Sequence, residues 1–70
     1  MPDSVYKIIE LIGTSTTSWE EAAKKAVESA AETLRELRVA EVIEQDLVIT
    51  DSKVEAFRTK IKVSFKYEGH

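Results

Sequence analysis

The last third of the chain contains the pattern that most restricts its fold, an alternation of apolar and polar side chains over about 12 residues. One set is largely apolar: Phe57, Thr59, Ile61, Val63, Phe65 and Tyr67. The residues between them are mostly basic: Arg58, Lys60, Lys62, Ser64 and Lys66. Because successive side chains of a strand point to opposite faces, this pattern predicts a long strand with one buried and one charged face.

The first half of the chain predicts a strand followed by a helix. Residues Val5–Ile12 are rich in β-formers, and the turn-forming segment Gly13–Ser18 ends them. Ser18 and Glu21 form a Ser-x-x-Glu capping box, which marks a helix N-terminus. An apolar stripe with spacings of three and four residues then predicts a helix that ends near Leu37. Its members are Trp19, Ala22, Ala23, Ala26, Val27, Ala30, Leu34 and Leu37.

The remaining segment, residues 38–49, alternates like a strand and is followed by a turn at residues 50–53. This turn places the second strand beside the third, and the helical crossover returns the second strand parallel to the first. The third strand then lies between the other two. We therefore expect an α+β fold of β-α-β-β order, a three-stranded antiparallel sheet packed on one helix, as a single domain over residues 1–70.

The first predicted strand has apolar side chains on both faces, which indicates burial on both sides. Tyr6, Ile8 and Ile12 point one way, and Val5, Ile9 and Leu11 point the other. One helix can cover only one face of the sheet. A chain of 70 residues without cysteine has no disulfide to supplement its small core. We therefore expect another subunit to cover the second face.

Several functions are disfavoured by composition. The net charge of −3 gives no electrostatic footprint for nucleic acid, and no apolar run is long enough to span a membrane. The N-terminus does not resemble a signal peptide, so we expect a cytoplasmic protein. The single histidine, His70, is the last residue, and no internal histidine can activate a serine or threonine. We do not expect an enzyme.

The chain from about Tyr6 to Tyr67 resembles the dodecins. The matching segments are Val5-Tyr6-Lys7, Glu10-Leu11-Ile12-Gly13-Thr14-Ser15, the alanine-rich helix, Ala40-Glu41-Val42 and Lys62-Val63-Ser64-Phe65. The resemblance implies a hollow homododecamer of cubic symmetry, and many dodecins bind flavins. It therefore implies self-association and a small ligand as partners.

The resemblance also places a flavin site, and the chain departs from it. Flavin-binding dodecins have a stacking tryptophan where this chain has Val39, and a glutamine where it has Arg58. Members that hold the flavin phosphate have a basic residue where this chain has Asp46, although Lys66 keeps a second positive charge. Arg58 could instead pair with Glu41 or Gln45. The flavin-site positions implied by resemblance are thus Val39, Glu41, Gln45, Arg58 and Lys66, and flavin (FMN or riboflavin) is less expected than calcium.

Calcium is implied by similarity to the branch of the family described as calcium dodecins, through Thr17-Ser18-Trp19-Glu20 and Arg38-Val39-Ala40. On chemistry alone, Glu41, Glu44 and Asp46 are the best metal ligands, because symmetry-related carboxylates can supply several oxygen atoms. We expect a non-enzymatic binding or storage protein for a small ligand or cation. The alternatives are a flavin-sequestering dodecin with a modified site and a structural module without a small ligand.

Overall fold

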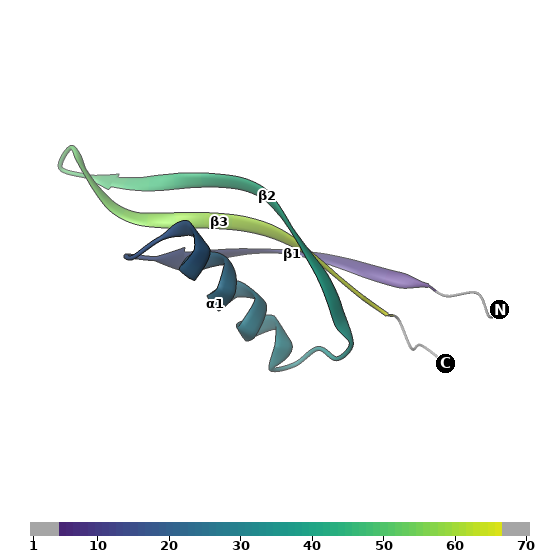
Figure 1. Cartoon of the computed structure of the whole chain (residues 1–70). Coiled ribbons are helices and arrows are strands. Elements are labelled where there is room, and N and C mark those ends of the chain that lie inside the picture. Colours follow the sequence, from purple (N-terminus) through teal and green to yellow (C-terminus); the bar gives the residue numbers. More distant parts are fainter. Residues whose placement is uncertain (1–4, 67–70) are drawn as a thin grey trace.

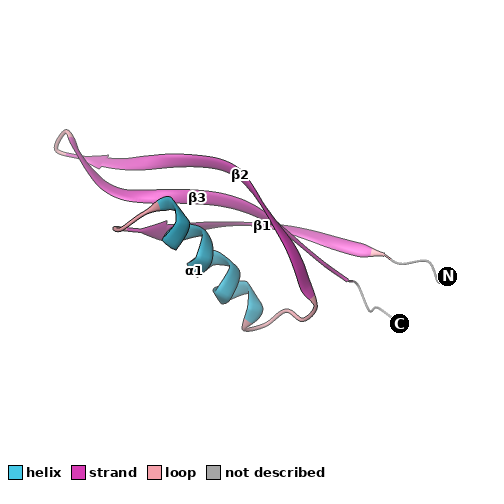
Figure 2. Ribbon diagram, in the orientation of Figure 1, coloured by secondary structure: helices cyan, strands magenta, loops and turns pink. Residues whose placement is uncertain are grey.

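The computed structural model describes residues 5–66, which form a three-stranded sheet and one helix (Figures 1 and 2). The elements follow the order β1 (Tyr6–Ser15), α1 (Trp19–Ala31), β2 (Leu37–Thr50) and β3 (Lys53–Lys66). Strand β3 lies in the middle and pairs antiparallel with both β1 and β2. The predicted β-α-β-β fold and the central place of the third strand are confirmed. Tyr67, the last residue of the predicted alternation, lies outside the described residues.

Helix α1 begins at the predicted cap. The hydroxyl oxygen of Ser18 accepts a hydrogen bond from the backbone N–H of Glu21 at 3.0 Å, and Ser18 itself is extended. Glu20 and Glu21 place negative charge at the positive end of the helix dipole. The helix is short and amphipathic, and no helix among residues 5–66 has the length and apolarity needed to cross a membrane.

The predicted C-terminus of the helix was wrong. The helix ends at Ala31, and Leu37 is already the first residue of β2, where it pairs with Phe65. The backbone N–H of Leu34 still bonds to the carbonyl oxygen of Ala30 at 2.9 Å, which closes the last turn. Glu36 then adopts a left-handed conformation with φ of 61°. Leu37 continues the apolar spacing of the helix, but its side chain packs on the core from a strand.

The core lies between α1 and the alternating face of β3. Ile61 and Val63 are fully buried against Ala26, and Ile9 and Leu11 of β1 pack around them. Thr59 is also fully buried, and its hydroxyl donates to the carbonyl oxygen of Trp19 at 2.8 Å. This bond satisfies a polar group that would otherwise be costly to bury.

Strands β2 and β3 are joined by a tight hairpin that extends beyond the helix (Figure 1). The two loop residues, Asp51 and Ser52, have φ of 52° and 63°. Positive φ at both positions is the mark of a type I′ turn, whose twist matches that of the flanking strands. The predicted turn at residues 50–53 is confirmed.

Candidate ligand-binding face of the sheet

The sheet face opposite α1 contains most of the charged residues singled out in the sequence. We call it the outer face. Its members, placed by the strand register, are Tyr6, Ile8, Glu10 and Ile12 of β1, Arg58, Lys60, Lys62 and Ser64 of β3, and Val39, Glu41, Glu44 and Asp46 of β2. The helix covers the other face (Figure 2). The outer face is therefore open to a ligand or to another subunit.

A register irregularity in β2 decides which acids reach this face. Glu41 and Glu44 are three residues apart, so in a regular strand they would point to opposite sides. The register shifts between Val42 and Glu44, so that Glu41 lies opposite Lys62 and Glu44 lies opposite Lys60. Such a bulge re-aims the side chains that follow it. All three predicted metal ligands consequently share the outer face.

The same register separates Gln45 from the other predicted site residues. Gln45 pairs with Thr59, whose side chain is buried on the helix side of the sheet. Glu41 and Arg58 lie on the outer face. Gln45 and Arg58 therefore lie on opposite faces, and the suggested pairing between them does not occur.

Arg58 pairs with Asp46 instead, and not with Glu41. The two residues are direct partners across β2 and β3. Nε of Arg58 donates to Oδ1 of Asp46 and a terminal guanidinium nitrogen donates to Oδ2, each at 2.7 Å. This bidentate arrangement is the strongest form of an arginine–carboxylate pair. The alternation of charges did not reveal the partner, because a register shift between Val48 and Ile49 determines which residue of β2 faces Arg58.

The Arg58 guanidinium changes the acidity of Asp46. Its hydrogen bonds, followed by its positive charge, hold the pKa of the Asp46 carboxyl below its ordinary value. In turn, the hydrogen bond to Asp46 and the negative charge of that residue raise the pKa of Arg58, and the charge of Glu44 adds to this effect. Arg58 is therefore paired with one carboxylate of β2, that of Asp46, and the charge of Glu44 acts on it more weakly.

Trp19, in the first turn of α1, forms a hydrogen bond with the backbone of Asp46. Its indole N–H donates to the backbone carbonyl oxygen of Asp46 at 3.0 Å. The edge of its ring contacts Phe57, with ring centroids 5.3 Å apart and planes at 75°. Trp19 is therefore a packing anchor. These contacts join the first turn of α1 to the β2–β3 hairpin.

The remaining basic residues of β3 are only partly matched by acids. Nζ of Lys60 lies 3.8 Å from Oε1 of Glu10, a long ion pair between exposed side chains. Glu10 was not among the predicted site residues, although its place in the alternation of β1 puts it on this face. Arg58 and Lys60 thus each pair with an acid on a neighbouring strand.

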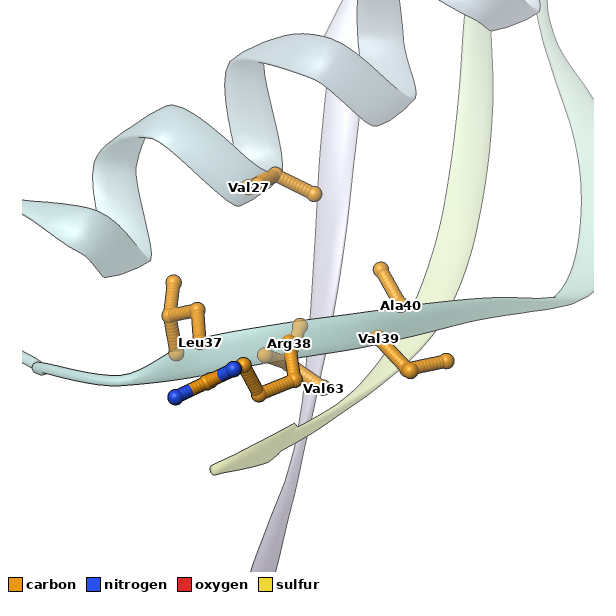
Figure 3. A pocket seen from close by; sticks show the side chains of 6 residues that line it. All are labelled: Val27, Leu37, Arg38, Val39, Ala40 and Val63. Carbon is orange, nitrogen blue, oxygen red and sulfur yellow. The ribbon is translucent and has the colours of Figure 1, made fainter. Parts of the chain in front are cut away.

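Val39 lies at the far end of the outer face from Asp46, next to a small pocket (Figure 3). The pocket lies between the second half of α1 and the start of β2, where the side chains of Val27, Leu37 and Ala40 approach one another. Its lining residues are Val27, Leu37, Arg38, Val39, Ala40 and Val63. A terminal guanidinium nitrogen of Arg38 donates to Oε1 of Glu36 at 2.7 Å. The other lining residues are aliphatic, so the pocket is mainly apolar.

The predicted site residues do not converge within one chain. Lys66 lies eight residues beyond Arg58 on the same strand, which corresponds to about 26 Å of extended chain. Within residues 5–66 of a single chain, no three acidic, histidine or cysteine side chains are grouped closely enough to hold a metal ion. A complete site built from these residues therefore requires more than one copy of the chain.

The fold and the open outer face define the class of protein, a small β-α-β-β domain whose sheet is covered by a helix on one face only. The Dodecin family model matches residues 5–68, and the chain belongs to the dodecin family, whose members form dodecamers. Calcium dodecin of Mycobacterium tuberculosis is 51% identical over 63 residues, which cover 90% of this chain and 89% of that protein. Dodecin of Thermus thermophilus is 38% identical over 64 residues, with 91% and 93% covered.

Solved structures agree with this assignment. The crystal structure of the Mycobacterium tuberculosis calcium dodecin, described as calcium-chelating and as having a novel calcium-binding site, superposes with a TM-score of 0.84 at 50% identity and 93% coverage of both chains. Dodecin of Streptomyces coelicolor superposes over the full length of both chains with a TM-score of 0.92 at 31% identity. This chain thus shares the dodecin fold with relatives at both 50% and 31% sequence identity.

Proposed function

We propose that this chain assembles as a hollow homododecamer that binds or stores cations, with calcium as the first candidate. The observation that carries the proposal is the uncovered outer face, which combines apolar residues for subunit contact with the acids of β2. Ile8 is 61% exposed in the single chain, and Tyr6 and Ile12 beside it are similarly open. Burial of these side chains by a second subunit is favourable at about 25 cal/mol per Å².

The acids of β2 supply the cation-binding part of the proposal. Glu41, Glu44 and Asp46 follow one another along the outer face. Calcium takes six to eight oxygen ligands, more than one such row provides, so copies related by symmetry would have to contribute. The net charge of −3 on every chain also favours cation accumulation in a closed shell. A relative with 51% identity is a calcium dodecin, which makes calcium the first cation to test.

Flavin binding with a modified site is the second candidate, and it rests on the family resemblance. Val39 provides no aromatic ring for stacking, and Arg58 is already engaged by Asp46. Both features weaken the flavin site that the resemblance implies. The remaining alternative is a purely structural role without any small ligand.

Native mass spectrometry combined with calorimetry tests the proposal. The chelator-treated protein should have a mass of twelve subunits without added flavin, and calcium titration should give saturable binding. Glu44→Gln should weaken that binding, whereas Glu28→Gln on the exposed side of α1 should not. A monomeric mass would contradict the assembly. A dodecamer that binds neither calcium nor riboflavin would support the structural alternative.

A further inference from the structure

We propose that Arg58 is a tethered cation that competes with metal ions for Asp46 and thereby sets the cation affinity of the outer face. This inference rests on the proposed cation-binding function. It assigns Arg58 a role in specificity, as a residue that selects against weakly bound cations. The argument has three parts: the geometry of the pair, its access to solvent, and the fixation of Asp46.

The geometry leaves little of Asp46 for a metal ion. Both carboxylate oxygens accept hydrogen bonds of 2.7 Å from the guanidinium of Arg58. Calcium binds through carboxylate oxygens, in one- or two-oxygen contact. A calcium ion must therefore share these oxygens with Arg58 or displace its nitrogens, and in either case it must approach a fixed positive charge. Arginine holds that charge at all physiological pH values.

The fold of the single chain does not block the competition. Without its partners, the chain leaves the side chains of Arg58 and Asp46 41% and 47% exposed, so its own elements do not enclose the pair. On the same strand, Lys60 makes only a 3.8 Å contact, and that contact is to Glu10 of β1. Arg58 is consequently the basic residue most closely bound to the acids of β2.

Asp46 does not depend on Arg58 for its position. Its backbone carbonyl oxygen accepts the indole N–H of Trp19, and its strand is paired with β3 on both sides of this residue. Removal of the guanidinium should therefore free the carboxylate without moving the strand. The freed carboxylate then lies on the same face of the sheet as that of Glu44.

The test is calcium calorimetry on the full-length, chelator-treated oligomer of four proteins: the wild type, Arg58→Gln, Arg58→Lys and Lys60→Gln. Arg58→Gln should bind calcium about tenfold more tightly, because it removes a nearby like charge and opens both oxygens. Arg58→Lys keeps the charge but loses the planar fork, and it should show a smaller gain. Lys60→Gln removes the same charge from the same face and should change affinity less than Arg58→Gln. An equal gain for Lys60→Gln would reduce the effect to net charge and overturn the proposal.

The outcomes separate this inference from the function on which it rests. If the wild type does not bind calcium and Arg58→Gln does, the proposed function fails for calcium while the competition is supported. If the wild type binds calcium and Arg58→Gln binds it equally or more weakly, the inference is overturned and the function stands. If neither protein binds, both are overturned. Native mass and circular dichroism establish that each variant is assembled. If Arg58→Gln does not assemble, Arg58→Lys is the deciding variant. A calcium affinity of Arg58→Lys equal to that of the wild type then overturns the inference.

Discussion

Gly13 of β1 lies directly beneath the backbone of Ala22 in α1. A methyl group on Gly13 would fall well inside van der Waals contact with the Ala22 carbonyl oxygen, and it would be 3.0 Å from the Cβ of Ala26. Both helix residues are buried. The small side chains on the two elements therefore determine how closely the helix can approach the sheet.

Gly13→Ala should destabilise the protein by about 3 kcal/mol, the upper part of the usual range for overpacking, because the obstructing atoms belong to a helix backbone that cannot rotate away. Thermal unfolding by circular dichroism at a fixed subunit concentration measures the change. Thr14→Ala is the matched control, because Thr14 is the next residue and is exposed. Equal stability of Gly13→Ala and the wild type would show that the helix can shift away from β1.

Trp19→Phe should lower the free energy of unfolding by about 1 kcal/mol, the net value of one hydrogen bond. The substitution removes the indole N–H that donates to Asp46 and keeps an aromatic ring against Phe57. Chemical denaturation followed by circular dichroism is the suitable measurement, because Trp19 is the single tryptophan of the chain. Lys25→Gln, at an exposed position in the middle of α1, should have little effect. An equal loss for both variants would argue against a specific role of the indole N–H.

The sequence predicted the fold more completely than the site. The alternation around Ile61 identified the central strand, because its period follows directly from strand geometry. The helix end was misplaced since Leu37 fits a helical spacing equally well, although the helix ends at Ala31 and Glu36 adopts a left-handed conformation before the strand begins. The partner of Arg58 was missed for a related reason. The register shift between Val48 and Ile49 places Asp46 opposite Arg58, and no residue type in the sequence marks that shift.

The pH dependence of stability should differ between the wild type and Asp46→Asn. The hydrogen bonds from Arg58 lower the pKa of Asp46 in the folded state, so its contribution to stability is present above the ordinary aspartate pKa of about 3.9. That contribution is lost as the pH falls through the lower folded-state pKa. The wild type should therefore be more stable than Asp46→Asn at neutral pH, and the difference should shrink below about pH 4.

Thermal unfolding of both proteins between neutral and acidic pH measures this difference. Asp51→Asn, in the β2–β3 turn, is the control for loss of one negative charge at an exposed position. A difference between wild type and Asp46→Asn that stays constant into strong acid would show that the ionised carboxylate of Asp46 is not what Arg58 stabilises.

Val39→Trp should increase the affinity for riboflavin, since it returns an aromatic ring to the position where the dodecin resemblance places the stacking tryptophan. Each stacked ring contributes about 0.5–1.5 kcal/mol beyond the area it buries, or about two- to tenfold in affinity. Val39 is exposed on the outer face in the single chain, so the larger side chain has space within its own subunit. Quenching of riboflavin fluorescence by wild type and variant measures the change.

Two further variants separate stacking from other effects at this position. Val39→Leu enlarges the side chain without adding an aromatic ring, and it should leave riboflavin affinity close to that of the wild type. Val39→Trp combined with Arg58→Gln also removes the guanidinium held by Asp46, and it should bind riboflavin more tightly than Val39→Trp alone. An equal gain from leucine and tryptophan would show that apolar contact, and not stacking, limits flavin binding. No gain in riboflavin affinity from the combined variant would instead show that residues other than Val39 and Arg58 limit flavin binding.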